Sequence, residues 1–218
     1  MKTPKQIISS KYTTEYASEY QPGSHNRVLK NKLGITRTRE IEDAELEGYM
    51  YAERRMLSEF AIDQRISLED IDRLHRLFLG SIYQWAGTYR TVNISKGGFP
   101  FASAHALPTA MKEFEKKILK PNTPCSGATR QKVTSKIAIV HAEFLLLHPY
   151  REGNGRTARL LATLMAYQAN LQGIDFGFIG SRGKHFNAYV GAIHSGLKRN
   201  YAPMQNIIAE ALRRAENE

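Results

Sequence analysis

Apolar side chains recur at helical spacing in two long segments of the chain. Over residues 130–147 they fall at successive steps of four, three, four and three, at Val133, Ile137, Val140, Phe144 and Leu147. Residues 156–172 carry a second apolar group, at Leu160, Leu161, Leu164, Met165 and Leu171. A stripe with this period lies along one face of an α-helix. The pattern therefore predicts two helices at the centre of the core.

The same period predicts further helices on both sides of this pair, over residues 39–60, 104–119, 182–198 and 203–215. One more helix is expected to begin at Ser67, because Asp70 supplies the acidic third position of an N-terminal cap. This helix carries His75, which is interpreted as a packing or surface histidine and not as a ligand.

Between residues 89 and 101 the period changes from helical to alternating. Residues 89–96 alternate along the chain, Gly97 and Gly98 follow, and an aromatic run ends at Phe101. A Gly-Gly pair between short alternating runs is typical of a β-hairpin. Because a lone hairpin is marginal in water, we expect it to lie on the helical body. Its outer edge either pairs with another peptide or has no binding role.

The predicted fold is therefore all-α with a small β-hairpin. Residues 1–35 are polar and are interpreted as an N-terminal arm, and residues 36–218 as a single domain, which a chain of 218 residues readily forms. No window approaches the ~18 apolar residues of a membrane span, and the start lacks the apolar stretch of a signal peptide. Together with a single cysteine, Cys125, these features predict a cytoplasmic protein that does not associate with membranes.

The chain has 31 basic and 21 acidic residues, a formal net charge of +10. Such an excess favours anionic partners. However, we find no run of five like charges and no RNA-binding or zinc-finger signature, so direct nucleic-acid binding is not expected. An acidic partner protein or a phosphate-bearing ligand accounts for the charge as well.

The segment between the two central helices, HPYREGNGRTAR from His148 to Arg159, holds the candidate chemistry. Pro149 disfavours helix at the residue before it, so the first helix should end at His148. Gly153 and Gly155 allow positive φ and close backbone approach, and the second helix follows at once. A glycine-rich turn that leads into a helix N-terminus directs backbone N–H groups at one point, which makes an anion site.

Charged side chains complete this candidate site. Arg156 and Arg159, three residues apart on the first turn of the helix, can both reach an anion there. Two arginines oppose the helix dipole at this end, so their placement is poor for stability and suits phosphate binding. Glu152 can hold Mg²⁺ beside phosphates, and His148 can accept a hydroxyl proton. These parts match phosphate-transfer chemistry, which depends on positioning and charge neutralisation.

At these residues the chain resembles the Fic family, whose signature is written HPF-x-[D/E]-GNGR-x-x-R. The match is complete except that Tyr150 replaces the usual Phe. The segment from Trp85 to Phe101 resembles the family's flap, and the similarity extends from Leu29 to the C-terminal helix. The resemblance implies the helical Fic fold and the transfer of AMP from ATP to a Ser, Thr or Tyr hydroxyl of a target protein, in a toxin- or effector-like role.

The resemblance also implies a role for each motif residue. His148 would be the general base and Glu152 the Mg²⁺ ligand. Gly153, Asn154 and Gly155 would form the anion hole, with Arg156 and Arg159 on the distal phosphates. The flap would bind the target segment by strand pairing, with three residues near the site, Ile94, Lys96 and Phe101. The candidates for the nucleoside pocket are Phe186 and Tyr189.

Several alternatives remain open or are excluded. Relatives that transfer a phosphoryl group have lysine where this chain has Gly155, which argues against that reaction, whereas other nucleotide donors and a catalytically silent binding module stay possible. A zinc-deaminase interpretation of His141 and Glu143 lacks its downstream cysteine pair. A P-loop interpretation of residues 177–185 has one residue too many between the glycines and no Ser or Thr after Lys184.

Members of the family are commonly inhibited by a helix with the motif [S/T]-x-x-x-E-[G/N], whose glutamate pairs with the second motif arginine, here Arg159. Segments ending at Glu42, Glu47 and Glu216 each match it in part. We interpret these glutamates as residues on solvated helix faces. The sequence therefore predicts no inhibitory helix within the chain and, if any restraint acts, a separate small antitoxin-like protein. Export into a host cell as an effector is compatible with this interpretation.

Overall fold

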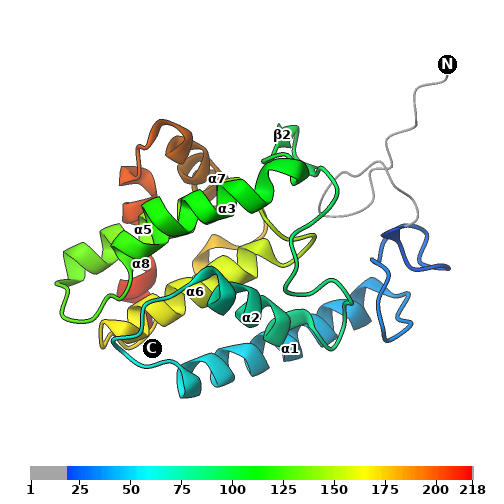
Figure 1. The fold of residues 1–218 in the computed structure, drawn as a ribbon, viewed down its shortest axis with the longest axis horizontal. Coiled ribbons are helices and arrows are strands. Elements are labelled where there is room, and N and C mark those ends of the chain that lie inside the picture. Colours follow the sequence, from blue (N-terminus) through cyan, green and yellow to red (C-terminus); the bar gives the residue numbers. More distant parts are fainter. Residues whose placement is uncertain (1–18, 218) are drawn as a thin grey trace.

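The computed structural model describes residues 19–217. Its longer helices are α1 (Thr38–Glu59), α2 (Leu68–Leu79), α3 (Leu107–Phe114), α5 (Arg130–Leu147), α6 (Asn154–Gln168), α7 (Lys184–Ser195) and α8 (Ala202–Ala215). Shorter turns of helix are η2 (Ala104–Ala106), η3 (Glu115–Leu119), α4 (Lys120–Asn122), η4 (Gly177–Ile179) and η5 (Gly196–Lys198). Two short strands, β1 (Ser95–Lys96) and β2 (Phe99–Pro100), form the one sheet in this part of the chain. The predicted all-α fold with a small hairpin is confirmed (Figure 1).

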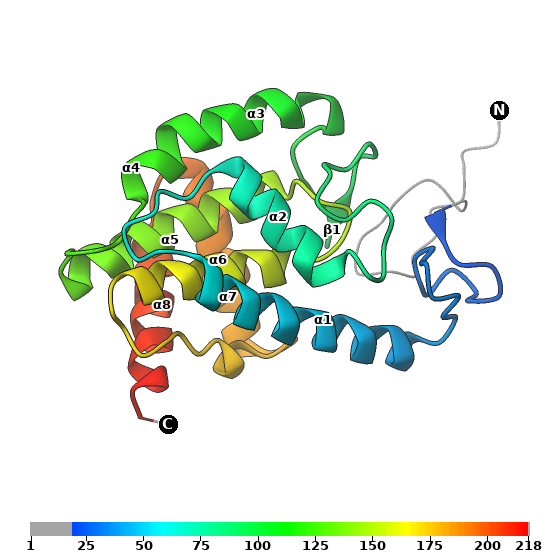
Figure 2. The same ribbon diagram turned by 60° about the horizontal axis from the view of Figure 1, so that its bottom comes forward.

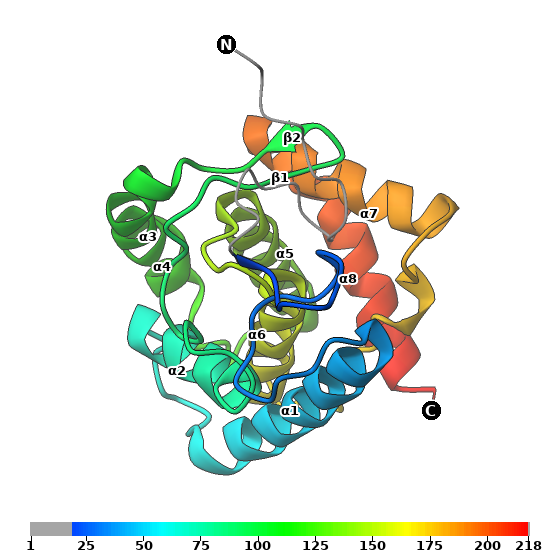
Figure 3. The same ribbon diagram turned by 90° about the vertical axis from the view of Figure 1, so that its right-hand side faces the viewer.

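Helices α5 and α6 form the centre of the molecule, as their apolar periodicity predicts. The two pack against each other, and α5 also packs against α3, α7 and α8. Viewed end-on in Figure 3, the other long helices surround this pair. The apolar side chains of α5 and α6, such as Ile137, Phe144 and Leu160, are fully buried. No helix within residues 19–217 is both long and apolar enough to cross a bilayer.

Helices α1 and α2 pack side by side and cover α6 from one side (Figure 2). The predicted cap of α2 is present, because the Asp70 N–H donates to the Ser67 hydroxyl at 3.2 Å and the Asp70 carboxylate accepts from the Ser67 N–H at 2.8 Å. Gly48 of α1 allows the close approach, since a Cβ there would lie 2.2 Å from the carbonyl oxygen of Phe78. This packing brings α1 next to the loop that precedes α6.

The predicted helix over residues 104–119 is divided in the structure. It begins as the 3₁₀ turn η2, continues as α3 and ends in the π-helical turn η3. Pro108 is the second residue of α3, where its missing N–H costs no helical hydrogen bond. Apolar spacing alone does not distinguish these helical types, because their periods are similar over a few residues.

The hairpin, which we call the flap (residues 95–101), is shorter than the alternating pattern predicts. Strand β1 contains only Ser95 and Lys96, which pair with Pro100 and Phe99 of β2 across the Gly97-Gly98 turn. Both glycines have positive φ. Residues 89–92 are not strand, and Arg90 instead bonds to loop carbonyls. The expectation that the flap lies on the helical body is confirmed.

Residues 19–35 pack against the body of the protein. A β-bridge joins Tyr20 to Leu29, and both side chains are buried. The Lys32 N–H donates to the Ile82 carbonyl at 2.8 Å, which attaches this segment to the residues that follow α2. The rest of the predicted arm, residues 1–18, lies outside the described residues.

Candidate active site

His148 lies where α5 ends, as predicted from Pro149. Its φ of 50° is left-handed, and its N–H still donates to the Phe144 carbonyl at 3.0 Å. The chain therefore reverses at this residue and enters the loop that leads to α6. We call residues 148–153 the motif loop.

The hydrogen bonds of the His148 ring indicate which nitrogen can act as a base. Nδ1 lies 2.8 Å from the Leu145 carbonyl oxygen. Because a carbonyl only accepts, Nδ1 carries the proton and Nε2 carries the lone pair. Burial lowers the pKa of His148 to about 4, although the bond to Leu145 opposes this shift. The imidazole is thus neutral near pH 7 and can accept a hydroxyl proton.

Asn154 holds the motif loop together from its end. Its Oδ1 accepts from the Tyr150 N–H and its Nδ2 donates to the Tyr150 carbonyl, both at 2.8 Å. Tyr150 is fully buried, stacks on His75 with ring centroids 3.7 Å apart, and donates its hydroxyl to Asp72 at 2.5 Å. Tyr150 therefore anchors the loop. A phenylalanine at this position could pack in the same way but could not bond to the Asp72 carboxylate.

The two glycines of the motif differ in their surroundings. Gly153 has a φ of 82°, and a Cβ there would lie 2.8 Å from Leu79. Gly155 lies in the first turn of α6, and a Cβ there would meet no atom of residues 19–217 within 4 Å. The N-cap residue of this helix, Gly153, has no side chain to bond the first N–H groups, which have no acceptor within the helix. The space in front of Gly155 is thus suited to an anion.

Glu152 places a carboxylate at the start of the same helix. It is largely buried, and its Oε1 accepts from the Gly153 N–H at 2.8 Å and lies 3.5 Å from Nη2 of Arg156. No group of three or more His, Cys, Asp or Glu side chains within residues 19–217 is arranged to hold a metal ion. One carboxylate beside an anion site suits Mg²⁺, which is usually bound through one or two carboxylates and substrate phosphates.

The two motif arginines contact different elements, although the spacing predicts that they share one face. Nη2 of Arg156 lies 2.6 Å from Glu45 of α1, and the guanidinium group lies over the Phe78 ring. Arg159 instead lies over the ring of Phe176, which follows α6 in the chain. The buried Glu45 carboxylate explains why Arg156 is tolerated at a helix N-terminus, because an ion pair offsets the unfavourable dipole.

Arg159 lies next to one of the two candidates for the nucleoside pocket. Tyr189 is buried on α7 and its hydroxyl lies 2.6 Å from Nε2 of His141. Burial raises the pKa of Tyr189 to about 12, and the charge of Arg159 opposes this shift. Phe186, one turn earlier, is half-buried and lies beneath Nζ of Lys96, 5.6 Å from the ring centroid. The nucleoside role of both residues stays a prediction.

The flap residues contact the site unequally. Phe101 stacks on the His148 ring with centroids 3.8 Å apart, and the charge of Lys96 contributes to the low pKa of His148. The Ile94 side chain is buried, and its carbonyl accepts from the Phe101 N–H at 3.3 Å. Ile94 therefore supports the flap from inside, and its part in target binding stays a prediction.

Three residues important for this geometry were not predicted from the sequence: Arg90, Glu45 and His75. Arg90 is buried, and its guanidinium donates to the carbonyls of His148 and Val92, both at 2.8 Å, and to that of Ala102. It thus joins both ends of the flap to the motif loop. In the sequence, Arg90 lies in the alternating segment over residues 89–96, and nothing in that pattern indicates this role.

His75 is interpreted from the sequence as a packing or surface histidine, and the structure shows that it is buried and that it bonds to the motif loop. The Gly87 N–H donates to its Nδ1 at 2.8 Å, so the proton lies on Nε2, which donates to the Glu152 carbonyl at 3.0 Å. Burial lowers the pKa of His75 to about 4, and the neutral ring therefore persists at pH 7. Its position on an apolar helix face was the one signal available in the sequence.

Comparisons with known proteins find a family model and relatives for this part of the chain. The Fic/DOC family model matches residues 65–166, which include α2, the flap and the motif. The chain is 27% identical to protein adenylyltransferase VbhT of Bartonella schoenbuchensis over 65% of its own length, and it spans 29% of that relative. It is 28% identical to the probable protein adenylyltransferase Fic of Escherichia coli, covering 68% of this chain and 74% of that one.

The fold also matches solved structures. The structure of BepC, a VirB-translocated effector protein of Bartonella tribocorum with bound AMPPNP, superposes with a TM-score of 0.67 at 21% identity. The alignment covers 84% of this chain and 91% of that one. At this identity the likeness concerns the fold.

Proposed function

Because the chain belongs to the Fic family, whose relatives named above are protein adenylyltransferases, we propose that it transfers AMP from ATP to a hydroxyl group of a target protein. One observation carries the proposal. A neutral histidine with its lone pair on Nε2 lies in the loop that leads to a helix N-terminus whose N-cap is a glycine, with open space in front of Gly155. This arrangement supplies a base and an anion site together.

In the proposed reaction, Nε2 of His148 accepts the proton of the target hydroxyl. The hydroxyl oxygen forms a bond to the α-phosphorus, and the bond from that phosphorus to the bridging oxygen breaks, so that pyrophosphate leaves. The N–H groups at the start of α6 stabilise the charge on the phosphate oxygens. Glu152 would hold Mg²⁺ against the phosphates, and this ion would neutralise their charge.

Arg159 is the better placed of the two arginines to bind the distal phosphates, since no carboxylate of residues 19–217 forms an ion pair with it. Arg156 is held by Glu45 and would have to share this carboxylate with a phosphate. We therefore expect Arg159→Ala to weaken ATP use more than Arg156→Ala.

The target protein would bind along the flap by adding a strand to an edge of its two-stranded sheet. Phe101 lies against His148, so a segment that binds there brings its hydroxyl close to the base. A Ser, Thr or Tyr of a target protein and a toxin- or effector-like role belong to this proposal. The basic net charge of the chain favours an acidic target.

Transfer of label from ATP tests the proposal. With Mg²⁺ and ATP labelled at the α-phosphate, we expect label to appear on a protein, which can be the enzyme itself. His148→Ala should abolish transfer and leave the helical content unchanged, because it removes the base and little core volume. The matched control is His105→Ala, an exposed histidine of η2, which should leave transfer unchanged.

Three outcomes would contradict adenylyl transfer. Label that arrives only from the γ-phosphate would indicate phosphoryl transfer. Label that arrives from another nucleotide and not from ATP would indicate a different donor. Failure to bind Mg²⁺ and ATP at all would support a catalytically silent binding module.

Regulation by a separate small antitoxin-like protein is part of the same proposal. Of the three candidate glutamates, Glu42 and Glu47 are exposed, and Glu216 pairs with Arg130. Glu45 pairs with Arg156, the first motif arginine and not the second. We therefore expect Glu45→Gln to leave transfer by the isolated chain unchanged or to lower it. A sharp increase would show that α1 inhibits the enzyme.

A further inference from the structure

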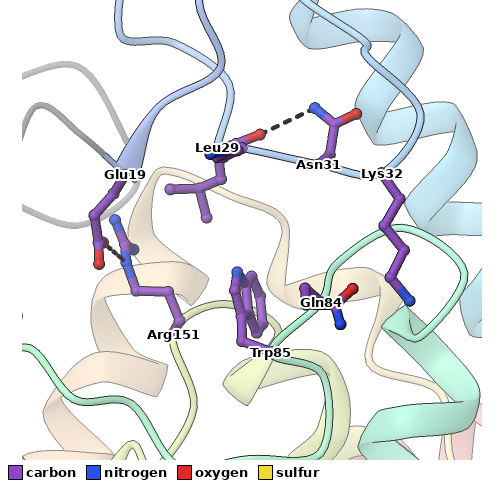
Figure 4. Close-up of a pocket in the computed structure, with 8 residues that line it drawn as sticks. Glu19, Leu29, Asn31, Lys32, Gln84, Trp85 and Arg151 are labelled. Atoms are coloured by element: carbon purple, nitrogen blue, oxygen red, sulfur yellow. Dashed lines mark hydrogen bonds and ion pairs between the residues drawn. The ribbon is translucent and has the colours of Figure 1, made fainter.

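Three arginines of the HPYREGNGRTAR segment differ in what fixes their side chains. Arg151 donates to Glu19, as Figure 4 shows, and Arg156 pairs with Glu45. Arg159 forms no ion pair with a carboxylate in the described part of the chain, and its buried Nε has no hydrogen-bond partner there. A long side chain that is to bind phosphates needs some other means of orientation, because ordering it on binding costs free energy.

A cluster of buried rings lies beside Arg159. Its guanidinium carbon is 5.5 Å from the ring centroid of Phe176, and Phe176 stacks on His141 of α5 with centroids 5.3 Å apart. His141 is fully buried. Its Nδ1 lies 3.2 Å from the carbonyl oxygen of Ala158, the neighbour of Arg159 in the chain, and its Nε2 lies 2.6 Å from the Tyr189 hydroxyl. His141 therefore joins α6, at the position of Arg159, to α7.

The Ala158 carbonyl sets the direction of the hydrogen bonds in this cluster. Because a carbonyl only accepts, Nδ1 of His141 carries the proton. Burial and then the charge of Arg159 lower the pKa of His141 to about 3, so the ring is neutral and Nε2 is an acceptor. The Tyr189 hydroxyl must then donate to Nε2, and its oxygen has only lone pairs left for any other neighbour.

Arg159 is such a neighbour of the Tyr189 hydroxyl. Burial raises the pKa of Tyr189 to about 12, and the charge of Arg159 and hydrogen bonding with its side chain oppose this shift. A guanidinium group only donates, so it needs an acceptor. A hydroxyl that rotates freely presents its proton as readily as its lone pairs. With that proton held by His141, the Tyr189 oxygen is a fixed acceptor for Arg159.

We propose that His141 and Tyr189 are positioning residues that orient Arg159 toward the distal phosphates of ATP. His141 holds the Tyr189 proton, the Tyr189 oxygen holds the guanidinium group, and the Phe176 ring supports it. This inference rests on the proposed function, since it takes ATP as the ligand of Arg159. Tyr189 then acts through Arg159 and not by contact with the nucleoside.

Calorimetric binding of ATP and of AMP, each with Mg²⁺, tests this role without requiring transfer. Tyr189→Phe keeps the ring and removes the acceptor, so the Kd for ATP should rise about tenfold. AMP lacks the distal phosphates, so its Kd should not change. Arg159→Ala should weaken ATP about thirtyfold. Adding Tyr189→Phe to it should weaken ATP no further, because the tyrosine acts through the arginine.

Two more variants complete the design. In His141→Leu, an apolar side chain cannot hold the tyrosine proton, so ATP should again bind about fivefold more weakly while AMP binding is kept. The matched control is Tyr201→Phe, which lies outside the cluster. Tyr201 also donates its hydroxyl to a side chain of α5, that of Glu143, and its loss should leave both affinities unchanged.

Four results would overturn the positioning role and leave the adenylyl-transfer proposal standing. They are unchanged ATP affinity in Tyr189→Phe, an equal loss for ATP and AMP, a further loss when Tyr189→Phe is added to Arg159→Ala, and a loss as large in Tyr201→Phe. The expected affinities together with no transfer of label from ATP would contradict the proposed function alone. Absence of ATP binding by the wild type would overturn both.

Discussion

The motif loop and the flap meet where the Phe101 ring stacks on His148, yet they are held in place in different ways. The motif loop has bonds between close neighbours, such as Asn154 with Tyr150 and His148 with Leu145, and further support from buried residues of α2, His75 and Asp72. The flap has two strands of two residues each, and its position depends on Arg90 and on ring contacts with His148 and His194. His194 lies on α7, far from the flap in sequence.

This difference has a consequence for catalysis. A loop held by its own neighbours and by buried partners on α2 is preorganised for the charged part of the reaction, where positions matter within fractions of an ångström. A flap held by a few long-range contacts can adapt to a target segment. The two regions should therefore respond differently to substitution, and the following changes test this from the largest expected effect on activity to the smallest.

Asn154→Ala should have the largest effect. It removes both bonds to Tyr150 and leaves a buried N–H and carbonyl without partners, at a cost of about 3 kcal/mol in the free energy of unfolding. Because the loop carries the base and the anion site, transfer should fall by about a hundredfold or more. Denaturant unfolding and an ATP-labelling assay on the folded fraction measure the two effects.

Asn31→Ala is the matched control for this change. Asn31 also uses both ends of its amide to hold a turn, through bonds to Leu29 and Ile35, but it lies outside the motif. It should lose comparable stability and keep its activity per folded molecule. Equal losses of activity in the two variants would mean that Asn154 acts only through stability.

Arg90→Lys should have a smaller and more selective effect. A lysine cannot reach the three carbonyls of His148, Val92 and Ala102 at once, so the flap loses its attachment to the motif loop. We expect the KM for the target protein to rise about tenfold while ATP affinity is kept. Arg213→Lys, at an exposed position of α8, should change neither. An equal loss of ATP binding would mean that Arg90 supports the anion site instead.

A change of pH should have the smallest effect on activity per folded molecule. The pKa of His148 is lowered to about 4, so the base stays neutral from pH 8 to pH 5 and transfer should be flat over this range. Activity should be lost only as pH falls towards about 4. A fall centred near pH 6.5 would show that the ring is not buried in solution as it is here.

Stability should nevertheless decrease over the same pH range. Burial lowers the pKa of His75 and His148 to about 4 and that of His141 to about 3. Below pH 6.5 the unfolded chain binds protons that the folded protein does not, so the free energy of unfolding falls as pH falls. We expect a loss of about 1 to 2 kcal/mol per histidine by pH 5, measurable by urea unfolding at each pH.

Much of this protein could be predicted from local sequence. The bounds of α5 agree with its apolar period, α2 begins at its capping box, and α5 ends before Pro149. The motif loop could be predicted because the residues that shape it, Pro149, Gly153 and Asn154, act on neighbours a few positions away. Hydrophobic period, capping and backbone preference all depend on residues that are close together in the chain, so they can be read from a single sequence.

Tertiary structure decided what no local pattern could express. Glu45 meets Arg156 from 111 positions away, Arg90 meets the carbonyl of His148 from 58, and Arg151 is buried with two nitrogens that have no partner among residues 19–217. The alternating pattern overestimated the strands for the same reason, since Arg90 bonds to loop carbonyls instead of joining a strand. The pairing of a buried charge depends on which helices pack together, and that is a property of the whole fold.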